Sequence, residues 1–295
     1  MIRSIDYLKI SDLYLNSDKP VISCEFFAPK TERGFQSLNK VFEKLKQASP
    51  AFYSVTYGAG GGTARPTLEL VCKIQDEFGI TSMPHLTCVN HSKEYLINYV
   101  LELKENGINN ILALRGDMPD SDGFVPHPEG LRFAADVVGL VGELNHFCIG
   151  VAAHPEGHPD STSLEEDIQY LKIKLDAGAD FAITQFFFDN EFYFKFLEMA
   201  RNIGIDKPII PGIIPFINSN HVMKFAKING TYIPDLLKEQ MFEAGDDRKR
   251  STKLGVEQAV KQCRELLDSG VPGIHFFTLN NSKPTLSVLQ RLGIN

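Results

Sequence analysis

Short apolar runs alternate with amphipathic stretches along almost the whole chain. The runs lack a helical period, which is typical of strands buried on both faces. Eight such runs are present, at residues 21–28, 52–58, 82–89, 110–117, 147–155, 181–189, 208–215 and 273–280. Strands that alternate with helices pair in parallel through right-handed crossovers, and eight of these units can close on themselves. The pattern predicts an α/β protein, a (β/α)8 barrel.

Two of the intervening stretches show clear helix signals. In 92–107, apolar residues recur at helical spacing, and Ser92 and Gly107 stand where an N-cap and a terminator belong. In 163–178, Ser163 and Glu166 have the spacing of a capping box.

The connection between the last two runs predicts two helices, the second near 249–268. We therefore expect one domain over 1–295, a barrel with a short N-terminal extension. An open doubly wound sheet is the alternative, although no G-x-G-x-x-G fingerprint and no phosphate-loop Lys follows any run.

Composition narrows the function classes. The net charge of −7 and the lack of a basic stripe argue against nucleic acid as the main partner. We interpret the basic run 248–250 as a solvated helix start. The five cysteines are widely spaced and form no CxxC pair, which fits a reducing cytoplasmic compartment. No apolar run approaches the roughly 18 residues of a membrane span.

Polar residues stand at or near the ends of most runs. In a barrel, the chemistry belongs at the carboxyl ends of the strands. One such residue is usually a satisfied core group, whereas several that converge on one mouth indicate a site. They are Glu25, Thr56, His85, Arg115, Asp117, His154, Gln185, Thr278 and Asn280. For the stretch 110–117 alone, a solvated loop salt bridge is the alternative.

Glu25 lies within Ser-Cys-Glu-Phe-Phe. Aromatic neighbours would desolvate the carboxyl and favour its neutral form, which can act as a general acid near neutral pH. A structural Glu paired with a buried Arg or Lys is the alternative.

Three further features have both a functional and a structural interpretation. The loop Gly58-Ala59-Gly60-Gly61-Gly62-Thr63 lets the backbone approach a ligand, or forms only a turn. Asp167, Tyr170 and Lys174 share a helix face, which is either solvated or a polar shelf for an extended cofactor. Among the histidines, His154-x-x-x-His158 has metal-ligand spacing, but Pro155 and Pro159 keep this stretch from being helical, so we expect no metal site.

Taken together, these motifs resemble methylenetetrahydrofolate reductase. The matching stretches are CEFFAPK (24–30), SVTYGAGGGT (54–63), PHLTC (84–88), LALRGD (112–117), AAHPEGHP (152–159), DAGADFAITQFFFD (176–189), IIPGIIP (209–215) and HFFTLN (275–280). The resemblance implies non-covalent FAD at the barrel mouth, reduced by NADH or NADPH. It implies that 5,10-methylenetetrahydrofolate then receives the hydride in a ping-pong reaction of one-carbon and methionine metabolism. It also leads us to expect a homo-oligomer.

The resemblance also assigns roles to residues. Glu25 matches the general acid that opens the five-membered folate ring, and Asp117 matches the carboxylate beside the flavin and pterin rings. Substrate contacts are implied for Gln185, Asp117, Phe277 and Asn281. Flavin, nicotinamide or other FAD contacts are implied for Thr56, Tyr57, Ala59, His85, Arg115, Gly116, Asp117, Phe133, Ala134, His154, His158, Asp167, Tyr170 and Lys174.

The chain departs from the family pattern at several positions. Asn281 stands where many relatives have Arg, Phe277 replaces a Tyr, and His154 occupies a position that is often Tyr. Ile173 replaces a residue that is basic in some members, and Lys283 is a candidate for the missing cation. Alternative interpretations are a flavin-independent reductase, a non-catalytic folate-binding homologue, and a metal-dependent barrel hydrolase or methyltransferase.

Overall fold

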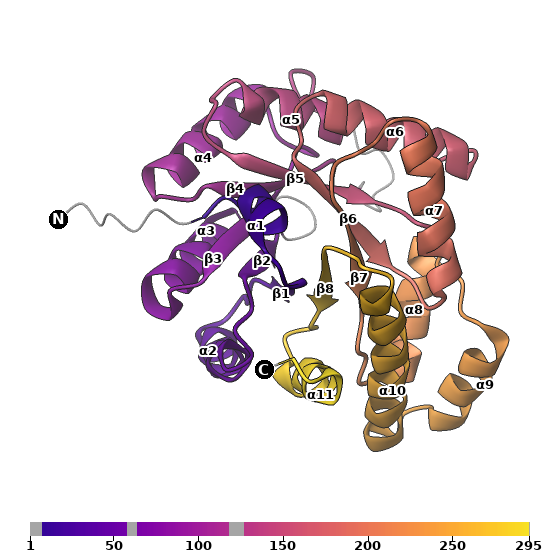
Figure 1. The fold of residues 1–295 in the computed structure, drawn as a ribbon. Helices are drawn as coiled ribbons and strands as arrows, with labels where there is room; N and C mark the ends of the chain where they lie inside the picture. Colours follow the sequence, from indigo (N-terminus) through magenta and orange to yellow (C-terminus); the bar gives the residue numbers. More distant parts are fainter. Residues whose placement is uncertain (1–7, 58–63, 118–126, 295) are drawn as a thin grey trace.

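The computed structural model describes residues 8–57, 64–117 and 127–294. Within these ranges the strands form one closed parallel barrel in sequence order (Figure 1). The barrel prediction is confirmed. The strands are β1 (Val21–Phe27), β2 (Phe52–Thr56), β3 (Thr81–Thr87), β4 (Asn110–Leu114), β5 (Cys148–Ala153), β6 (Phe181–Phe186), β7 (Ile209–Ile213) and β8 (Gly273–Phe277).

Every predicted run overlaps a strand, but each strand ends one to three residues before the run does. The predicted carboxyl ends were therefore wrong. The extra residues belong to the loops at the barrel mouth, where the chain leaves the extended conformation. Gly116, for example, has φ +87°.

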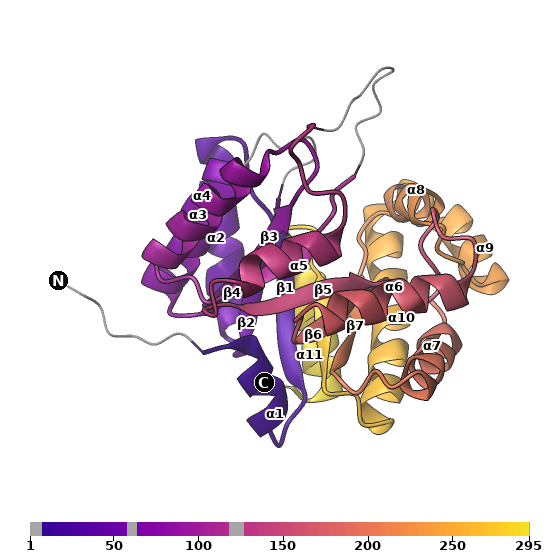
Figure 2. The ribbon, with the colours of Figure 1, turned by 90° about the horizontal axis from the view of Figure 1, so that it is seen from above.

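Helices surround the barrel (Figures 1 and 2). They are α1 (Ile10–Asn16), α2 (Glu32–Lys46), α3 (Ala64–Lys73) with the π-helical η1 (Ile74–Phe78), α4 (Lys93–Glu105), α5 (Ala134–Gly142), α6 (Leu164–Asp176), α7 (Asn190–Asn202), α8 (Ser219–Asn229), α9 (Asp235–Ala244), α10 (Arg248–Asp268) and α11 (Ser282–Leu292). The connection from β7 to β8 holds α8, α9 and α10, so the prediction of two helices was wrong. Gly230 and Pro234 separate α8 from α9.

The predicted caps are mostly confirmed. Ser92 caps α4, and Ser163 accepts a hydrogen bond from the backbone N–H of Glu166. The capping box is only half correct, because the Glu166 carboxylate accepts from the N–H of Thr162 and not from that of Ser163. Arg248 begins α10, as the basic run predicted.

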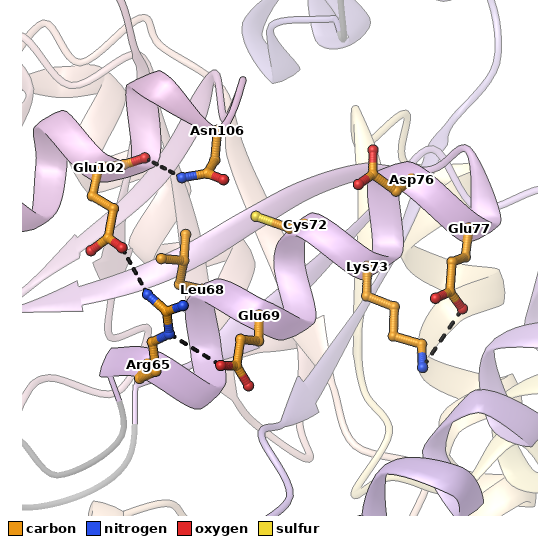
Figure 3. Close-up of a pocket in the computed structure, with 9 residues that line it drawn as sticks. All are labelled: Arg65, Leu68, Glu69, Cys72, Lys73, Asp76, Glu77, Glu102 and Asn106. Atoms are coloured by element: carbon orange, nitrogen blue, oxygen red, sulfur yellow. Dashed lines mark hydrogen bonds and ion pairs between the residues drawn. The ribbon is translucent and has the colours of Figure 1, made fainter. Parts of the chain in front are cut away.

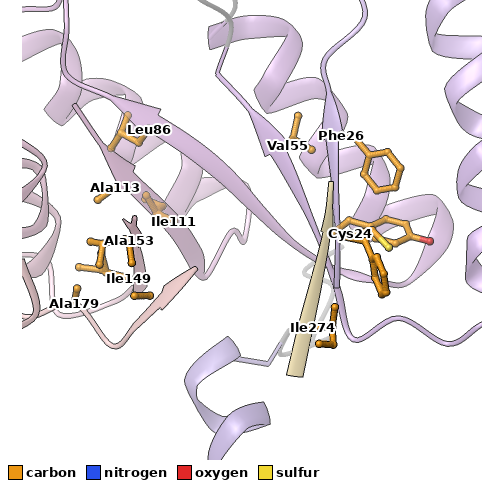
Figure 4. Close-up of a cluster of buried hydrophobic side chains, with 14 of the residues drawn as sticks. Cys24, Phe26, Val55, Leu86, Ile111, Ala113, Ile149, Ala153, Ala179 and Ile274 are labelled. Carbon is orange, nitrogen blue, oxygen red and sulfur yellow. The ribbon is translucent and has the colours of Figure 1, made fainter. Parts of the chain in front are cut away.

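Side chains alternate between the two faces of each strand. In β1, Ile22, Cys24 and Phe26 pack in the layer between strands and helices, which Figure 4 shows in part. Val21 instead belongs to a separate apolar cluster, together with residues of other strands such as Phe52. Ser23 and Glu25 follow Val21 at two-residue spacing and therefore share its face. This period places polar groups inside the barrel.

The helix α1 closes the amino-terminal end of the barrel (Figure 2). Ile10 is fully buried, and its N–H donates to the side-chain oxygen of Asn110 in β4. Tyr14 packs against the ring of Phe181 in β6 at a centroid distance of 5.5 Å. Access to the barrel interior is therefore left to the mouth at the carboxyl ends of the strands.

Candidate active site

Three titratable side chains meet where β1, β3 and β8 end. The Oε2 of Glu25 lies 3.4 Å from Nε2 of His85 and 3.6 Å from Nε2 of His275. The three side chains are 13%, 8% and 0% exposed. The barrel thus holds a carboxyl between two imidazoles in a site with little access to water.

Two serines on the neighbouring strands β1 and β2 fix the position of His275. Its Nδ1 lies 2.8 Å from the hydroxyl of Ser23, and its Nε2 lies 3.5 Å from that of Ser54. When Ser23 donates its proton to Nδ1, the Nε2 proton of neutral His275 is free to face Glu25. The sequence interpretation did not include His275. His275 stands two residues before Phe277, just as Ser23 stands two residues before Glu25. This two-residue period could have indicated that His275 faces the barrel interior.

The expectation that Glu25 is held neutral by aromatic neighbours was wrong. Burial raises the pKa of the Glu25 carboxyl, but the charge on His85 and the hydrogen bond and charge of His275 together lower this pKa below its usual value. Phe26 cannot desolvate the carboxyl, because consecutive residues of a strand point to opposite faces. Burial lowers the pKa of His85.

A second cluster lies where β4, β5 and α6 meet. Burial, followed by the charges on Lys174, His158 and Arg115, lowers the pKa of His154 to about 3. Its Nδ1 lies 3.8 Å from Oδ2 of Asp167. This nitrogen is buried and makes no hydrogen bond within the described part of the chain.

Hydrogen bonds hold three polar side chains of this cluster in place. The Nη2 of Arg115 donates to Asp160 at 2.9 Å, and Nδ1 of His158 accepts from the N–H of Asp160. The ammonium of Lys174 donates to the carbonyl of Ala152 at 2.6 Å. Burial lowers the pKa of Lys174 to about 8, although Asp167 opposes this shift.

Gly116 shapes the turn that follows β4. A Cβ atom at this position would lie 2.7 Å from Val89 and 2.9 Å from Thr87, and φ is +87°. Only glycine fits such a turn without strain. Asp117 follows it, exposed and beyond the end of the strand.

The other predicted cofactor contacts are dispersed. Thr56 ends β2, and the Tyr57 hydroxyl lies 3.1 Å from Nε2 of His91. Phe133 is 61% exposed and precedes α5, which begins at Ala134. Tyr170 is also exposed and donates to Glu166, whereas Asp167 on the same helix is buried. Ala59 and the other glycine-loop residues at 58–63 lie outside the described residues.

Two of the predicted substrate contacts lie at the carboxyl ends of β6 and β8. Gln185 is partly exposed in β6, and the ring of Phe277 lies 6.2 Å from that of Phe186. Asn281 instead caps α11 by accepting from the N–H of Lys283.

Thr278 and Asn280 fasten the end of β8 to the end of β1. The Thr278 hydroxyl donates to the carbonyl of Glu25, and the Asn280 amide exchanges two hydrogen bonds with the backbone of Phe27. They hold Glu25 in place through its backbone.

The family model for methylenetetrahydrofolate reductase matches residues 9–293. The chain belongs to this family. It is 40% identical to the 5,10-methylenetetrahydrofolate reductase of Salmonella typhimurium over 92% of this chain and 90% of that protein. It is 37% identical to methylenetetrahydrofolate reductase 1 of Schizosaccharomyces pombe over 97% of this chain, which spans 49% of that protein.

The fold also matches a solved structure. An uncharacterised Clostridium thermocellum protein, described as binding two copies of 5-methyl-5,6,7,8-tetrahydrofolic acid, superposes with a TM-score of 0.67 at 17% identity. The match covers 95% of this chain and 96% of that one. At this identity the likeness shows the fold alone.

The second cluster fits the anionic part of the dinucleotide cofactor that the methylenetetrahydrofolate reductase family implies. Arg115, His158 and Lys174 all lie close enough to His154 to lower its pKa, and Nδ1 of His154 is an unpartnered buried atom among the described residues. Two cationic side chains, Arg115 and Lys174, together with two imidazoles that can donate N–H groups, are chemistry that suits a diphosphate.

Glu156 carries a buried carboxyl near this cluster. Its Oε2 accepts from the N–H of Tyr232, and its Oε1 makes no hydrogen bond to any described residue. Burial raises the pKa of Glu156 from 4.5 to about 7; the Tyr232 bond opposes this shift and the charge on Asp189 adds to it.

The pKa of Glu156 predicts a pH-dependent stability. The folded state favours the protonated carboxyl of Glu156. Its contribution to the free energy of unfolding is therefore fully present below pH 4.5 and is lost as the pH rises through about 7. We expect Glu156→Gln to unfold at higher urea concentration than the wild type at pH 8, with little difference at pH 4.5. An equal loss of stability at both pH values would contradict this assignment.

Two surface pockets lie away from the three-residue centre. One, between α3 and α4, is lined by charged groups that pair with one another, such as Arg65 with Glu69 and Glu102 (Figure 3). Burial raises the pKa of its Cys72 thiol to about 11, which makes a poor nucleophile. The other lies between α10 and α11.

No cluster of potential metal ligands occurs among the described residues. In the same ranges, no helix has the length and apolar character needed to cross a membrane.

Proposed function

We propose that this protein reduces 5,10-methylenetetrahydrofolate to 5-methyltetrahydrofolate with NADH or NADPH and non-covalently bound FAD. The observation that carries the proposal is the Glu25 carboxyl, buried between His85 and His275 at the barrel mouth of a methylenetetrahydrofolate reductase family member. We also propose that it works in the cytoplasm as a homo-oligomer.

The residues divide the work between two regions of the mouth. Arg115, His158 and Lys174 would hold the diphosphate of FAD, with His154 and Asp167 between them. The bound flavin would accept a hydride from the nicotinamide and supply it to the folate. Asp117 would lie beside the reacting rings, and Gln185 would orient the substrate.

Glu25 would transfer the proton, and His275 would orient its carboxyl. Opening the five-membered ring of the folate requires a proton on the departing nitrogen. Because the pKa of Glu25 is lowered in the free site, the carboxyl is ionised there and must first take up a proton. The proton would come from solvent at the barrel mouth, because Glu25 is 13% exposed, and the Nε2–H of neutral His275, 3.6 Å away, is placed to orient the carboxyl.

The purified protein tests this function directly. We expect visible flavin absorption that bleaches on anaerobic addition of NADH or NADPH and returns with 5,10-methylenetetrahydrofolate, with formation of 5-methyltetrahydrofolate. Folate binding without flavin and without turnover would instead support the folate-binding homologue, a function compatible with the described Clostridium protein.

Lys174 provides a test of the cofactor contacts. Lys174→Met keeps the aliphatic stem and removes the charge. Loss of a hydrogen bond to a charged group costs about 1.5–3 kcal/mol, so we expect FAD to bind roughly 10- to 100-fold more weakly. Flavin titration of the apoprotein measures this. The matched control is Lys172→Met on the same helix, where Lys172 pairs with Asp176. Equal affinities in the two variants would contradict a role for Lys174.

A further inference from the structure

A basic groove of about 490 Å³ lies between α10 and α11. The described residues that line it include four cationic side chains and no acidic one, although the chain as a whole has a net charge of −7. The cations are Lys249, Lys253, Lys283 and Arg291. This local excess of positive charge predicts an anionic occupant.

Most of this charge is not neutralised by the protein itself. Among the described residues, Lys253 is the only one of the four in an ion pair, with Glu257 at 4.0 Å. The nearby Asp247 is already engaged, because it accepts from the N–H groups of Lys249 and Arg250 at the start of α10. The cations are thus available to a ligand.

The groove begins beside the barrel mouth. α11 starts at Ser282, shortly after the end of β8, and α10 ends at Asp268, shortly before β8 begins. Both helices therefore start on the mouth side and run down the outer wall. Arg291 lies eight residues after Lys283, about 12 Å along the helix at 1.5 Å per residue.

The lining also suits a flexible chain with spaced charges. Val256 and Pro284 are buried residues that supply apolar surface between the cations. Methylene groups can pack there while carboxylates reach the lysines and Arg291. The roughly 12 Å from Lys283 to Arg291 along α11 corresponds to roughly three residues of an extended chain.

We propose that this groove binds the tail of a folate that carries several glutamyl residues. This inference rests on the proposed function. Each added glutamyl residue brings one further carboxylate, and the groove begins at Lys283, six residues after Phe277 at the end of β8. Asn281 is engaged in capping α11, so Lys283 provides the first cation that the tail meets. Diphosphate chemistry belongs to the β4–β5 side, around Arg115 and Lys174.

The test compares folates with one and with three glutamyl residues. The variant is Lys249→Gln with Arg291→Gln, which removes one cation from each helix and leaves Lys283, near the end of β8, in place. The matched control is Lys261→Gln, an exposed lysine of the same helix that does not line the groove. Exposed ion pairs are individually weak, so we expect the KM ratio that favours the triglutamate to fall roughly three- to tenfold in the double variant only.

Binding provides a second readout that does not depend on turnover. Calorimetric titration with 5-methyltetrahydrofolate triglutamate should show the same loss of affinity. The wild-type preference for the triglutamate should also shrink as salt is raised, because the groove is open to solvent.

The possible failures are distinguishable. A wild-type protein without preference for the triglutamate would overturn the inference, as would a preference unchanged in the double variant. The double variant could instead raise the KM for NADH or NADPH and leave the KM for the triglutamate unchanged. This result would assign the groove to the dinucleotide and would also overturn the inference. Tight, groove-dependent binding of the triglutamate with no reduction of either folate would contradict the proposed reaction alone.

Discussion

Glu25→Gln should reduce the rate of folate reduction by about 10²- to 10⁴-fold, the usual contribution of a general acid. The amide keeps the shape of the side chain between His85 and His275 but cannot deliver a proton. Oxidation of NADH or NADPH with an artificial electron acceptor needs no proton at the folate nitrogen, so this activity should survive. Steady-state assays of both activities on the same preparation measure the difference.

The control for this experiment is Glu102→Gln, which removes a carboxylate paired with Arg65 on the outer wall. It should leave both activities unchanged. An equal loss of the two activities in Glu25→Gln would mean that Glu25 supports the cofactor or the fold. Glu25 would then not be the general acid, and His85 and His275 would have a structural role.

Gly116→Ala should lower the free energy of unfolding by about 2–5 kcal/mol. A left-handed backbone costs an L-residue roughly 1–2 kcal/mol, and overpacking against Val89 and Thr87 adds about 1–3 kcal/mol. Urea denaturation measures the loss. Because Arg115 and Asp117 flank the glycine, we also expect weaker retention of FAD.

Gly107→Ala separates the cost of the left-handed backbone from the cost of overpacking. Gly107 has φ +75°, but a Cβ there would meet no atom within 4 Å. This variant should therefore lose only the strain contribution, about 1–2 kcal/mol. If both variants lost the same free energy, the contacts with Val89 and Thr87 would have relaxed, and the close packing of the turn would not matter to stability.

The barrel could be predicted because its signal is repeated along the whole chain. The strand ends could not, because the apolar runs continue into loops whose backbone geometry depends on contacts such as those around Gly116. The helix α1 escaped prediction for a related reason. Its seven residues are too few for an isolated helix, so tertiary contacts with Asn110 and Phe181 must stabilise it.

The candidate site could be predicted in part. Treating each apolar run as buried on both faces identified Glu25 and His85. It overlooked the two-residue period that brings Ser23 and His275 into the same barrel interior. The pKa of Glu25 was predicted in the wrong direction, because its neighbours in sequence are not its neighbours in space. The interaction with His275 joins residues 250 positions apart, and no local pattern encodes it.

The placement of α1 has a consequence for the order of folding. Its partners lie in β4, β5 and β6, since Ile10 bonds Asn110, Ser11 bonds Cys148 and Tyr14 packs on Phe181. More than half of the chain must therefore leave the ribosome before this helix can dock. Contacts at such separations form slowly because the intervening loop must first close. The segment synthesised near the beginning is thus among the last to reach its place, and it seals the barrel only after the middle strands have assembled.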